Sequence, residues 1–382
     1  MLIFKKKLPL SLYIHIPWCV RKCPYCDFNS HEAKSDLPQV LYVNALIQEL
    51  DSRLHFIQAR PITSIFFGGG TPSLFSAESI GTILEAIAKR VSLEKDIEIT
   101  LEANPGTIDE THFSGFKSAG INRLSIGIQS FQDDKLKTLG RIHNQANALR
   151  AVNMAHQAGF ENFNLDIMYG LPNQTIDDAL HDIETALALQ PTHFSWYQLT
   201  IEPNTVFYKK PPRLPADELI WNMQCAGQAL LQTTGFHQYE VSAYSKMNRE
   251  CLHNKNYWEF GDYLGIGAGA HSKMTQHDTN EVIRFSQVRH PKDYLDANKR
   301  KRLETTVITE HDIIFEFMLN ALRLTNGFPT NLFTERTGLP LSRIQTVLSA
   351  AIERGLLLQD ENYLRPSTLG KKFLNDLTMM FL

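Results

Sequence analysis

Short apolar, β-branched runs alternate with longer segments of helical periodicity over the first half of the chain. The short runs close on glycine, proline or a polar turn and cover residues 11–17, 62–70, 97–105, 123–130, 162–172 and 193–203. Between them, apolar residues recur at helical spacing over residues 37–54, 77–91, 147–160 and 177–190. This alternation, at a spacing of about thirty residues, predicts βαβ units that build a parallel sheet.

Six such units by about residue 205 favour a full or partial barrel over a doubly wound sheet. The fold class that we predict is therefore α/β, a partial (β/α)6, TIM-like barrel. Functional groups of such barrels lie at the carboxyl ends of the strands. Three cysteines and the motifs GGGTP, EANP, IQS and DIMYGLP each follow a predicted strand, so the site is expected at that rim.

The pattern changes after residue 205. A proline-rich loop leads to a predicted helix at 217–234, and residues 240–245 and 262–272 read as strands or extended loops. Helical periodicity returns at 310–324 and 341–357, and a β-hairpin wing is predicted at 357–366. We predict a barrel in residues 1–205, a barrel extension with a ligand-binding segment (argued below) in 206–305, and a smaller, mainly helical, winged-helix-like domain in 306–382.

Composition narrows the class of protein. A net charge of −3 and the absence of a strong basic excess give no reason to expect a nucleic-acid partner. The chain has no apolar run of transmembrane length, and no apolar stretch follows the basic run Lys5–Lys7, so we expect a cytoplasmic protein. Five cysteines, three of them clustered, suit metal binding or catalysis better than disulfides.

The segment HIPWCVRKCPYCDFN (residues 15–29) holds Cys19, Cys23 and Cys26 in a C-x3-C-x2-C pattern directly after the first predicted strand. A structural zinc site needs a fourth ligand, which His15 or His31 would have to supply. Chance clustering of structural cysteines is another alternative. We favour a [4Fe–4S] cluster, because thiolates are its usual ligands and three of them leave one iron open for a small ligand.

This motif, with the aromatic Tyr25 before its last cysteine, resembles the radical S-adenosylmethionine (SAM) superfamily. The resemblance implies a radical SAM barrel, with the amino and carboxylate groups of SAM bound to the open iron. It also implies reductive cleavage of SAM to a 5′-deoxyadenosyl radical. The cofactors supply this chemistry, while the protein supplies placement and the exclusion of water and oxygen.

The turn GGGTP and the motif EANP offer further ligand groups. Gly69 and Gly70, followed by Thr71, let a ligand approach the backbone closely, although a plain tight turn needs glycines too. Glu102 is a carboxylate at a strand end, or else a helix cap.

Three polar residues lie farther along the rim. Gln129 is an amide in an apolar strand and needs a hydrogen-bond partner. Arg141 can bind a carboxylate through both of its terminal nitrogens, or lie on the surface. Asp166 interrupts an apolar strand, which is costly unless it meets a hydroxyl or a cation.

Taken in order, YIHIPWC, GGGTPS, LEANPGT, RLSIGIQSF, LGRIHN and DIMYGLP resemble the oxygen-independent coproporphyrinogen III oxidase-like family over most of the chain. The region from about residue 310 resembles that family's C-terminal domain. The resemblance implies roles at the SAM site: the glycine turn meets the methionine amino group, Arg141 pairs with the carboxylate, Gln129 and Asp166 hold the ribose, and Tyr13 and Glu102 complete the pocket.

Two departures separate this chain from the oxidases. Phe28 stands where their C-x3-C-x2-C-x-C motif has its last cysteine, and the first strand begins near residue 11, without their N-terminal extension. Both departures resemble the haem-chaperone branch of the family, whose members bind haem and pass it to acceptor proteins.

The segment HNKNYW (residues 253–258) also resembles that branch. It makes His253 a candidate axial haem ligand and lets Tyr257 and Trp258 cover the macrocycle. Cys251 could instead supply a thiolate, and GIGAGAHS (265–272) is a close-approach wall of the same pocket or merely a turn.

We therefore expect a haem-binding chaperone that carries a [4Fe–4S] cluster and SAM. Its expected partners are haem and haem-acceptor proteins, with respiratory haem enzymes as candidates and transient contact with membrane proteins. An oxygen-independent coproporphyrinogen III oxidase is the main alternative, and a radical enzyme with another substrate is a third. The sequence assigns no catalytic residue.

Overall fold

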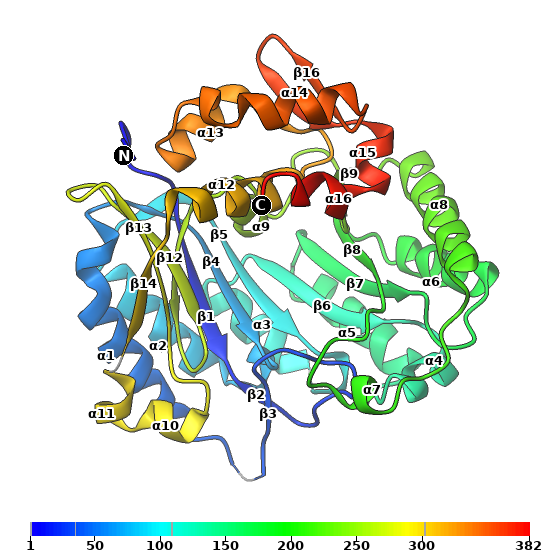
Figure 1. The fold of residues 1–382 in the computed structure, drawn as a ribbon. Coiled ribbons are helices and arrows are strands. Elements are labelled where there is room, and N and C mark those ends of the chain that lie inside the picture. Colours follow the sequence, from blue (N-terminus) through cyan, green and yellow to red (C-terminus); the bar gives the residue numbers. More distant parts are fainter. Residues whose placement is uncertain (1, 35, 108–109, 302) are drawn as a thin grey trace.

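The computed structural model describes residues 2–34, 36–107, 110–301 and 303–382. Its centre is a sheet that the described residues build from twelve strands, in the order β14-β13-β12-β11-β1-β4-β5-β6-β7-β8-β10-β9 (Figure 1). The parallel strands are β1 (Leu10–Ile16), β4 (Ile62–Gly69), β5 (Leu93–Ala103), β6 (Arg123–Gln129), β7 (Phe163–Tyr169), β8 (His193–Gln198) and β11 (Asp262–Ile266).

The sheet is curved but open, because β14 and β9 are two edges that no ladder of described residues joins. The predicted partial (β/α)6 barrel is thus confirmed, with its six units in chain order from β1 to β8. One strand had no place in that prediction: β11 comes from the extension and pairs in parallel with β1 on the side away from β4.

Helices cover the outer face of the sheet (Figure 1). They are α1 (Gln39–Ile57), α2 (Ala77–Ala88), α3 (Glu110–Ala119), α4 (Asp133–Thr138), α5 (Gln145–Gln157), α6 (Ile176–Ala188) and α8 (Asp217–Thr233). Side-chain caps fix several of their starts: Ser76 accepts from a backbone N–H of α2, and Asn144 and Thr175 form capping boxes on α5 and α6. The sequence did not predict α3 and α4.

The barrel core forms between the sheet and these helices. Leu10, Leu12, Ile14 and Ile16 on one face of β1 are all fully buried in it. The alternate positions of the same strand face the barrel interior, and they include Tyr13. Because successive side chains of a strand point to opposite faces, one face of β1 supplies the core and the other faces the site.

The extension adds antiparallel strands at both sheet edges: β9 (His237–Glu240), β10 (Ala243–Ser245), β12 (His271–Gln276), β13 (Glu281–Ser286) and β14 (Glu304–Val307). The run 262–272 is therefore two strands separated by a turn. The sequence did not reveal β14, because all four of its residues are exposed and carry no alternating pattern.

Helix α9 (Leu252–Trp258) closes the amino-terminal end of the barrel. It precedes β11, whose Asp262 lies opposite Leu10 at the start of β1, and it packs against β1, β4 and β11. The HNKNYW segment is thus a helix at the barrel end opposite the cysteine loop (Figure 1).

The C-terminal region packs over α9 and has its own apolar core. Its elements are α12 (Glu310–Ala321), β15 (Phe328–Pro329), α13 (Thr330–Thr337), η3 (Leu341–Ile344), α14 (Gln345–Glu353), β16 (Leu357–Asp360), β17 (Tyr363–Pro366), α15 (Thr368–Lys372) and α16 (Leu374–Met379). The expected hairpin is present as β16–β17, and β15 joins it. Phe4 and Leu8 from the start of the chain also pack into this second core.

The remaining elements are short. They are β2 (Trp18–Cys19), β3 (His31–Glu32), η1 (Pro72–Leu74), η2 (Pro105–Thr107), α7 (Val206–Lys209), α10 (Pro291–Leu295) and α11 (Ala297–Arg300). Within the described part of the chain, no helix has both the length and the apolar character needed to cross a bilayer.

Candidate cofactor site

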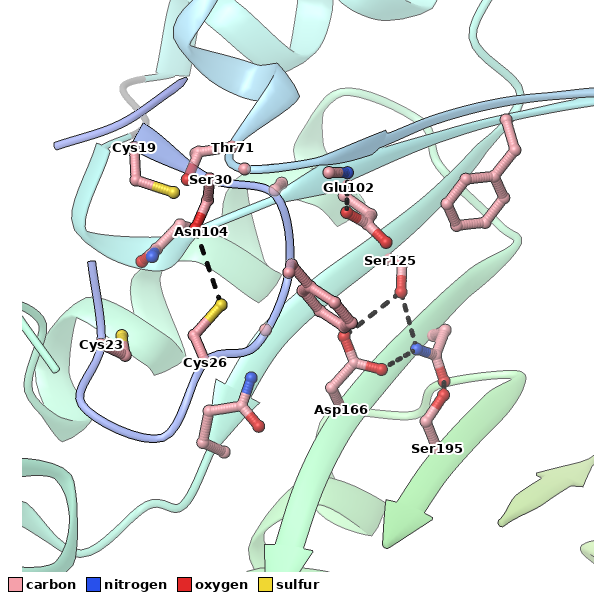
Figure 2. Close-up of a pocket in the computed structure, with 18 of the residues that line it drawn as sticks. Cys19, Cys23, Cys26, Ser30, Thr71, Glu102, Asn104, Ser125, Asp166 and Ser195 are labelled. Atoms are coloured by element: carbon pink, nitrogen blue, oxygen red, sulfur yellow. Dashed lines mark hydrogen bonds between the residues drawn. The ribbon is translucent and has the colours of Figure 1, made fainter. Parts of the chain in front are cut away.

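One cavity of about 420 Å³ lies inside the barrel, and every site residue chosen from the sequence lines it. They are Tyr13, Cys19, Cys23, Tyr25, Cys26, Gly69, Gly70, Thr71, Glu102, Gln129, Arg141, Asp166 and His253. Figure 2 shows the three cysteines on one loop at one side of the cavity, with Glu102, Ser125, Asp166 and Ser195 at the other. Five barrel strands, the cysteine loop with β2, the turn after β4, the segment between α4 and α5, and helix α9 thus all contribute residues to a single site.

The cysteine loop connects β1 to α1 and is closed at its base. Strand β2 pairs with β3, which holds Cys19 opposite Glu32, and Thr71 N donates to Trp18 O at 2.7 Å. All three cysteines are half-buried and free of disulfides. The loop therefore presents three thiols to the cavity.

The loop fits an iron–sulfur cluster better than a zinc ion. His15 uses both ring nitrogens, with Tyr13 Oη at 3.1 Å and Asn29 O at 2.8 Å, and His31 does not line the cavity. No three Cys, His, Asp or Glu side chains of the described residues are grouped tightly enough for a single metal ion. Within the described residues, three spaced thiols line the cavity and neither His15 nor His31 presents a free ring nitrogen to it, which suits a cluster of several irons.

The turn after β4 must consist of glycines, because neighbouring atoms leave no room for a side chain at Gly69 or Gly70. Gly69 has φ +117°, and a Cβ there would lie 2.6 Å from the His15 ring. A Cβ on Gly70 would lie 2.5 Å from Trp18 O. The turn is therefore more than a plain turn, because it packs directly against the cysteine loop.

Glu102 lies at the end of β5 and accepts a hydrogen bond from Gly69 N at 3.2 Å. Glu102 thus bonds to the glycine turn rather than to a helix end. Burial, followed by the nearby Asp166 carboxylate, raises the pKa of Glu102 to about 8. The carboxyl group is therefore mostly protonated at pH 7 and ready to exchange its proton for a ligand donor.

Asp166 belongs to a buried polar group that the sequence reading found only in part. Asn164 Nδ2 donates to Asp166 Oδ1 at 2.7 Å, and Ser125 Oγ donates to Asp166 Oδ2 at 3.3 Å. Ser195 also lines the cavity there (Figure 2). Strand periodicity would have identified Asn164, because it lies two positions before Asp166 and so on the same face of β7.

Gln129 and Arg141 connect this group to the cysteines. Gln129 accepts from Tyr197 Oη at 2.7 Å and has φ +69°. Arg141 is not a surface arginine: it lines the cavity, donates to Gly127 O at 2.8 Å and reaches Cys23 Sγ at 3.6 Å. Its guanidinium thus lies directly beside the cysteine loop.

His253 lies deep in the cavity, on α9, and is 1% exposed. Its Nδ1 is 3.1 Å from Ser64 Oγ and its Nε2 is 3.2 Å from Tyr257 Oη. Burial, followed by the Arg123 charge, lowers the pKa of His253 to about 3, so the ring is neutral.

Of the other residues proposed for a haem pocket near His253, Cys251 and Trp258 lie outside this cavity. Cys251 is fully buried, points its Sγ at Glu98 and does not line the cavity. Trp258 stacks under Arg323 toward the C-terminal region. Tyr257 does line the cavity, and Gly269 and His271 of the GIGAGAHS segment line a second cavity beside it.

Comparison with known proteins supports the class that this geometry indicates. A model of the radical SAM superfamily matches residues 13–186, and a model of the HemN C-terminal domain matches residues 308–373. The solved structure of coproporphyrinogen III oxidase (HemN) from Escherichia coli covers 98% of this chain and 90% of its own, with a TM-score of 0.81 and 22% identity. The fold and the site therefore define a radical SAM protein.

Curated relatives narrow the family. A protein named "Heme chaperone HemW" from Haemophilus influenzae is 51% identical over 98% of both chains. Proteins of the same name from Escherichia coli K12 and Bacillus subtilis are 46% and 36% identical; they match 98% and 97% of this chain and 98% and 99% of their own. The chain belongs to the HemW family.

Proposed function

We propose that this protein is a haem chaperone that holds a [4Fe–4S] cluster and SAM in the barrel and transfers haem to acceptor proteins. The observation that carries the proposal is the full-length similarity to proteins named heme chaperones, combined with Phe28 at the cavity. Phe28 occupies the position of the last cysteine in the oxidase motif, and its side chain is 63% exposed.

Cys19, Cys23 and Cys26 would hold the cluster, which supplies an electron for the cleavage of SAM when both are bound. The chain's own residues bind and orient SAM. Arg141, beside Cys23, binds the methionine carboxylate, while the glycine turn and Glu102 accept from its amino group. Gln129 and Asp166 bind the ribose hydroxyls, and Tyr13 and Tyr25 exclude water from the pocket. Support for these roles comes from the convergence of all these side chains on one cavity.

The acceptors in this proposal are haem proteins of the cytoplasm and of the cytoplasmic membrane face, respiratory haem enzymes among them. Contact with a membrane protein is then transient, at the time of transfer. The net charge of −3 favours no nucleic acid as a further partner.

One anaerobic experiment separates a chaperone from an oxidase. After cluster reconstitution, the protein is given reductant, SAM and coproporphyrinogen III, and a second sample is titrated with haem. We expect no protoporphyrinogen and stoichiometric haem binding. Protoporphyrinogen formed over multiple turnovers would instead make the protein a decarboxylase in which Phe28 replaces the cysteine.

Glu102→Gln tests the SAM site without disturbing the fold. At pH 7 it replaces a mostly protonated carboxyl with a neutral amide, so stability and iron content should not fall. The carboxyl can lose its proton when it meets the SAM ammonium and become a charged acceptor, which an amide cannot, so SAM binding should weaken by about ten- to a hundredfold, as measured by calorimetry. Glu94→Gln, on an exposed position of the same strand, is the control and should bind SAM normally. Unchanged affinity in Glu102→Gln would remove Glu102 from the site.

A further inference from the structure

A second cavity of about 400 Å³ adjoins the first at the carboxyl ends of β1 and β11. Tyr13, Phe28, Gly69, Glu102 and Tyr257 line both cavities. The volume lies within the range of about 300–1,000 Å³ that is usual for small-molecule and cofactor pockets. A ligand here would therefore lie next to the SAM site.

Aromatic rings form much of its wall. Tyr257 and Tyr263 pack edge to face, with ring centroids 4.6 Å apart, and Tyr13 separates this cavity from the first. Phe28 completes the wall from the cysteine loop and is largely exposed. Aromatic walls beside a largely exposed Phe28 suit a planar aromatic ligand that leaves one edge in solvent.

Three histidines line the two cavities, and they differ in what their ring nitrogens do. Those of His253 contact Ser64 and Tyr257, and those of His15 contact Tyr13 and Asn29. The His271 ring has no hydrogen bond to any side chain or backbone group of the described residues, and it is exposed at the start of β12. An iron ligand needs a free nitrogen, so His271 meets this condition without any rearrangement.

Arg289 stands at the same cavity. Its side chain is exposed and forms no ion pair within the described chain. Asn29 Nδ2 donates to Arg289 O and to Ala268 O, each at 2.9 Å, and so fastens this backbone to the cysteine loop. Because its backbone is held in place and its guanidinium is free, Arg289 can bind a carboxylate group on the solvent-exposed edge of a ligand.

We infer that the second cavity is the haem site, with His271 as the axial iron ligand and Arg289 as the partner of a haem propionate. The inference rests on the proposed function and specifies its haem site. It differs from a His253-ligated haem, which would require His253 to give up a hydrogen bond and become accessible on α9.

The test is a titration of the full-length, cluster-reconstituted protein with ferric haem, followed by absorption, electron paramagnetic resonance and resonance Raman spectroscopy. His271→Ala should lose the imidazole-ligand signature and bind haem about tenfold or more weakly. Free imidazole added to this variant should restore the signature. His237→Ala, at an exposed position on β9, is the matched control and should behave as wild type.

Arg289 is tested with a modified ligand. Arg289→Ala should weaken haem binding by about tenfold, but should leave binding of haem dimethyl ester, which lacks free carboxylates, unchanged. An equal loss with both ligands would overturn the propionate contact.

Other outcomes are also decisive. A wild-type signature in His271→Ala, or its loss in His253→Gln with folding and iron content intact, would overturn the inference and leave the proposed function standing. Wild-type protein that takes up no haem would overturn the proposed function and this inference together.

Discussion

Replacing Cys23 with serine is expected to abolish the iron–sulfur cluster while leaving the protein folded. A serine hydroxyl at this position is a poor substitute for a thiolate, and only two cluster ligands would remain in the loop. Iron and acid-labile sulfide should fall to near zero after anaerobic reconstitution, and SAM cleavage should be lost with them. The fold should persist, because Cys23 is half-buried on a loop and a serine there can still face Arg141, whose Nη1 lies 3.6 Å from the Cys23 Sγ.

Cys225→Ser is the matched control, since Cys225 is a free, exposed cysteine on α8. It should keep full iron and sulfide content. The free energy of unfolding of either apoprotein should change by less than about 1 kcal/mol. A Cys23→Ser protein with a full complement of iron and sulfide would show that the cluster has other ligands.

Among the substitutions considered, Asp262→Asn is expected to lower the free energy of unfolding most. Asp262 is fully buried at the start of β11, where Arg60 Nη1 donates to Oδ2 at 2.6 Å and Lys273 Nζ donates to Oδ1 at 3.1 Å. Both cations are themselves buried. The neutral amide would leave them without a counter-charge, which costs about 3–5 kcal/mol in the free energy of unfolding measured with denaturant.

The control is Asp51→Asn, because Asp51 pairs with Arg90 while 47% exposed. Solvent screens such pairs, so its cost should stay below about 1 kcal/mol. Equal losses in the two variants would contradict the assigned importance of the buried group.

At acid pH, the difference in the free energy of unfolding between the wild-type protein and Asp262→Asn should become smaller. Burial alone would raise the pKa of Asp262, but Lys273 and Arg60 outweigh it and hold the pKa below 3.8. A depressed folded pKa contributes stability above the unfolded pKa, and this contribution is lost as pH falls through the folded value. The gap between the two proteins should therefore be constant near neutral pH and shrink below about pH 4.

The barrel and most of its site residues could be predicted from the sequence, because the hydrophobic pattern of its strands is strong and local. The strands β1, β4, β6, β7 and β8 are apolar runs that end at glycine or polar turns, and the site residues follow those ends. The rule that parallel strands bring their carboxyl ends to one rim then places Glu102, Gln129 and Asp166 together. The additional residues Ser125, Asn164 and Ser195 were missed because small polar residues in strands have many uses.

The two candidate haem ligands show where sequence reasoning ends. His253 and His271 are both histidines in motifs of the extension, and no local pattern tells them apart. Packing does: α9 turns His253 into the barrel against Ser64 and Tyr257, whereas β12 leaves the His271 ring exposed. The contact with Ser64 joins residues 189 positions apart, so no local pattern could show it.

The sequence by itself determined the barrel units, the cysteine loop and the rim residues, because hydrophobic period and strand-end position are local properties of the chain. The tertiary structure alone decided that β11 pairs beside β1, that Phe4 and Leu8 join the C-terminal core, and that Arg60, Asp262 and Lys273 meet. These contacts join segments that lie far apart along the chain, as Ile3 N and Gly338 O do. Their energies depend on the burial of side chains and on the pairing of opposite charges. Both arise only when distant segments meet, so the sequence of one segment does not reveal them.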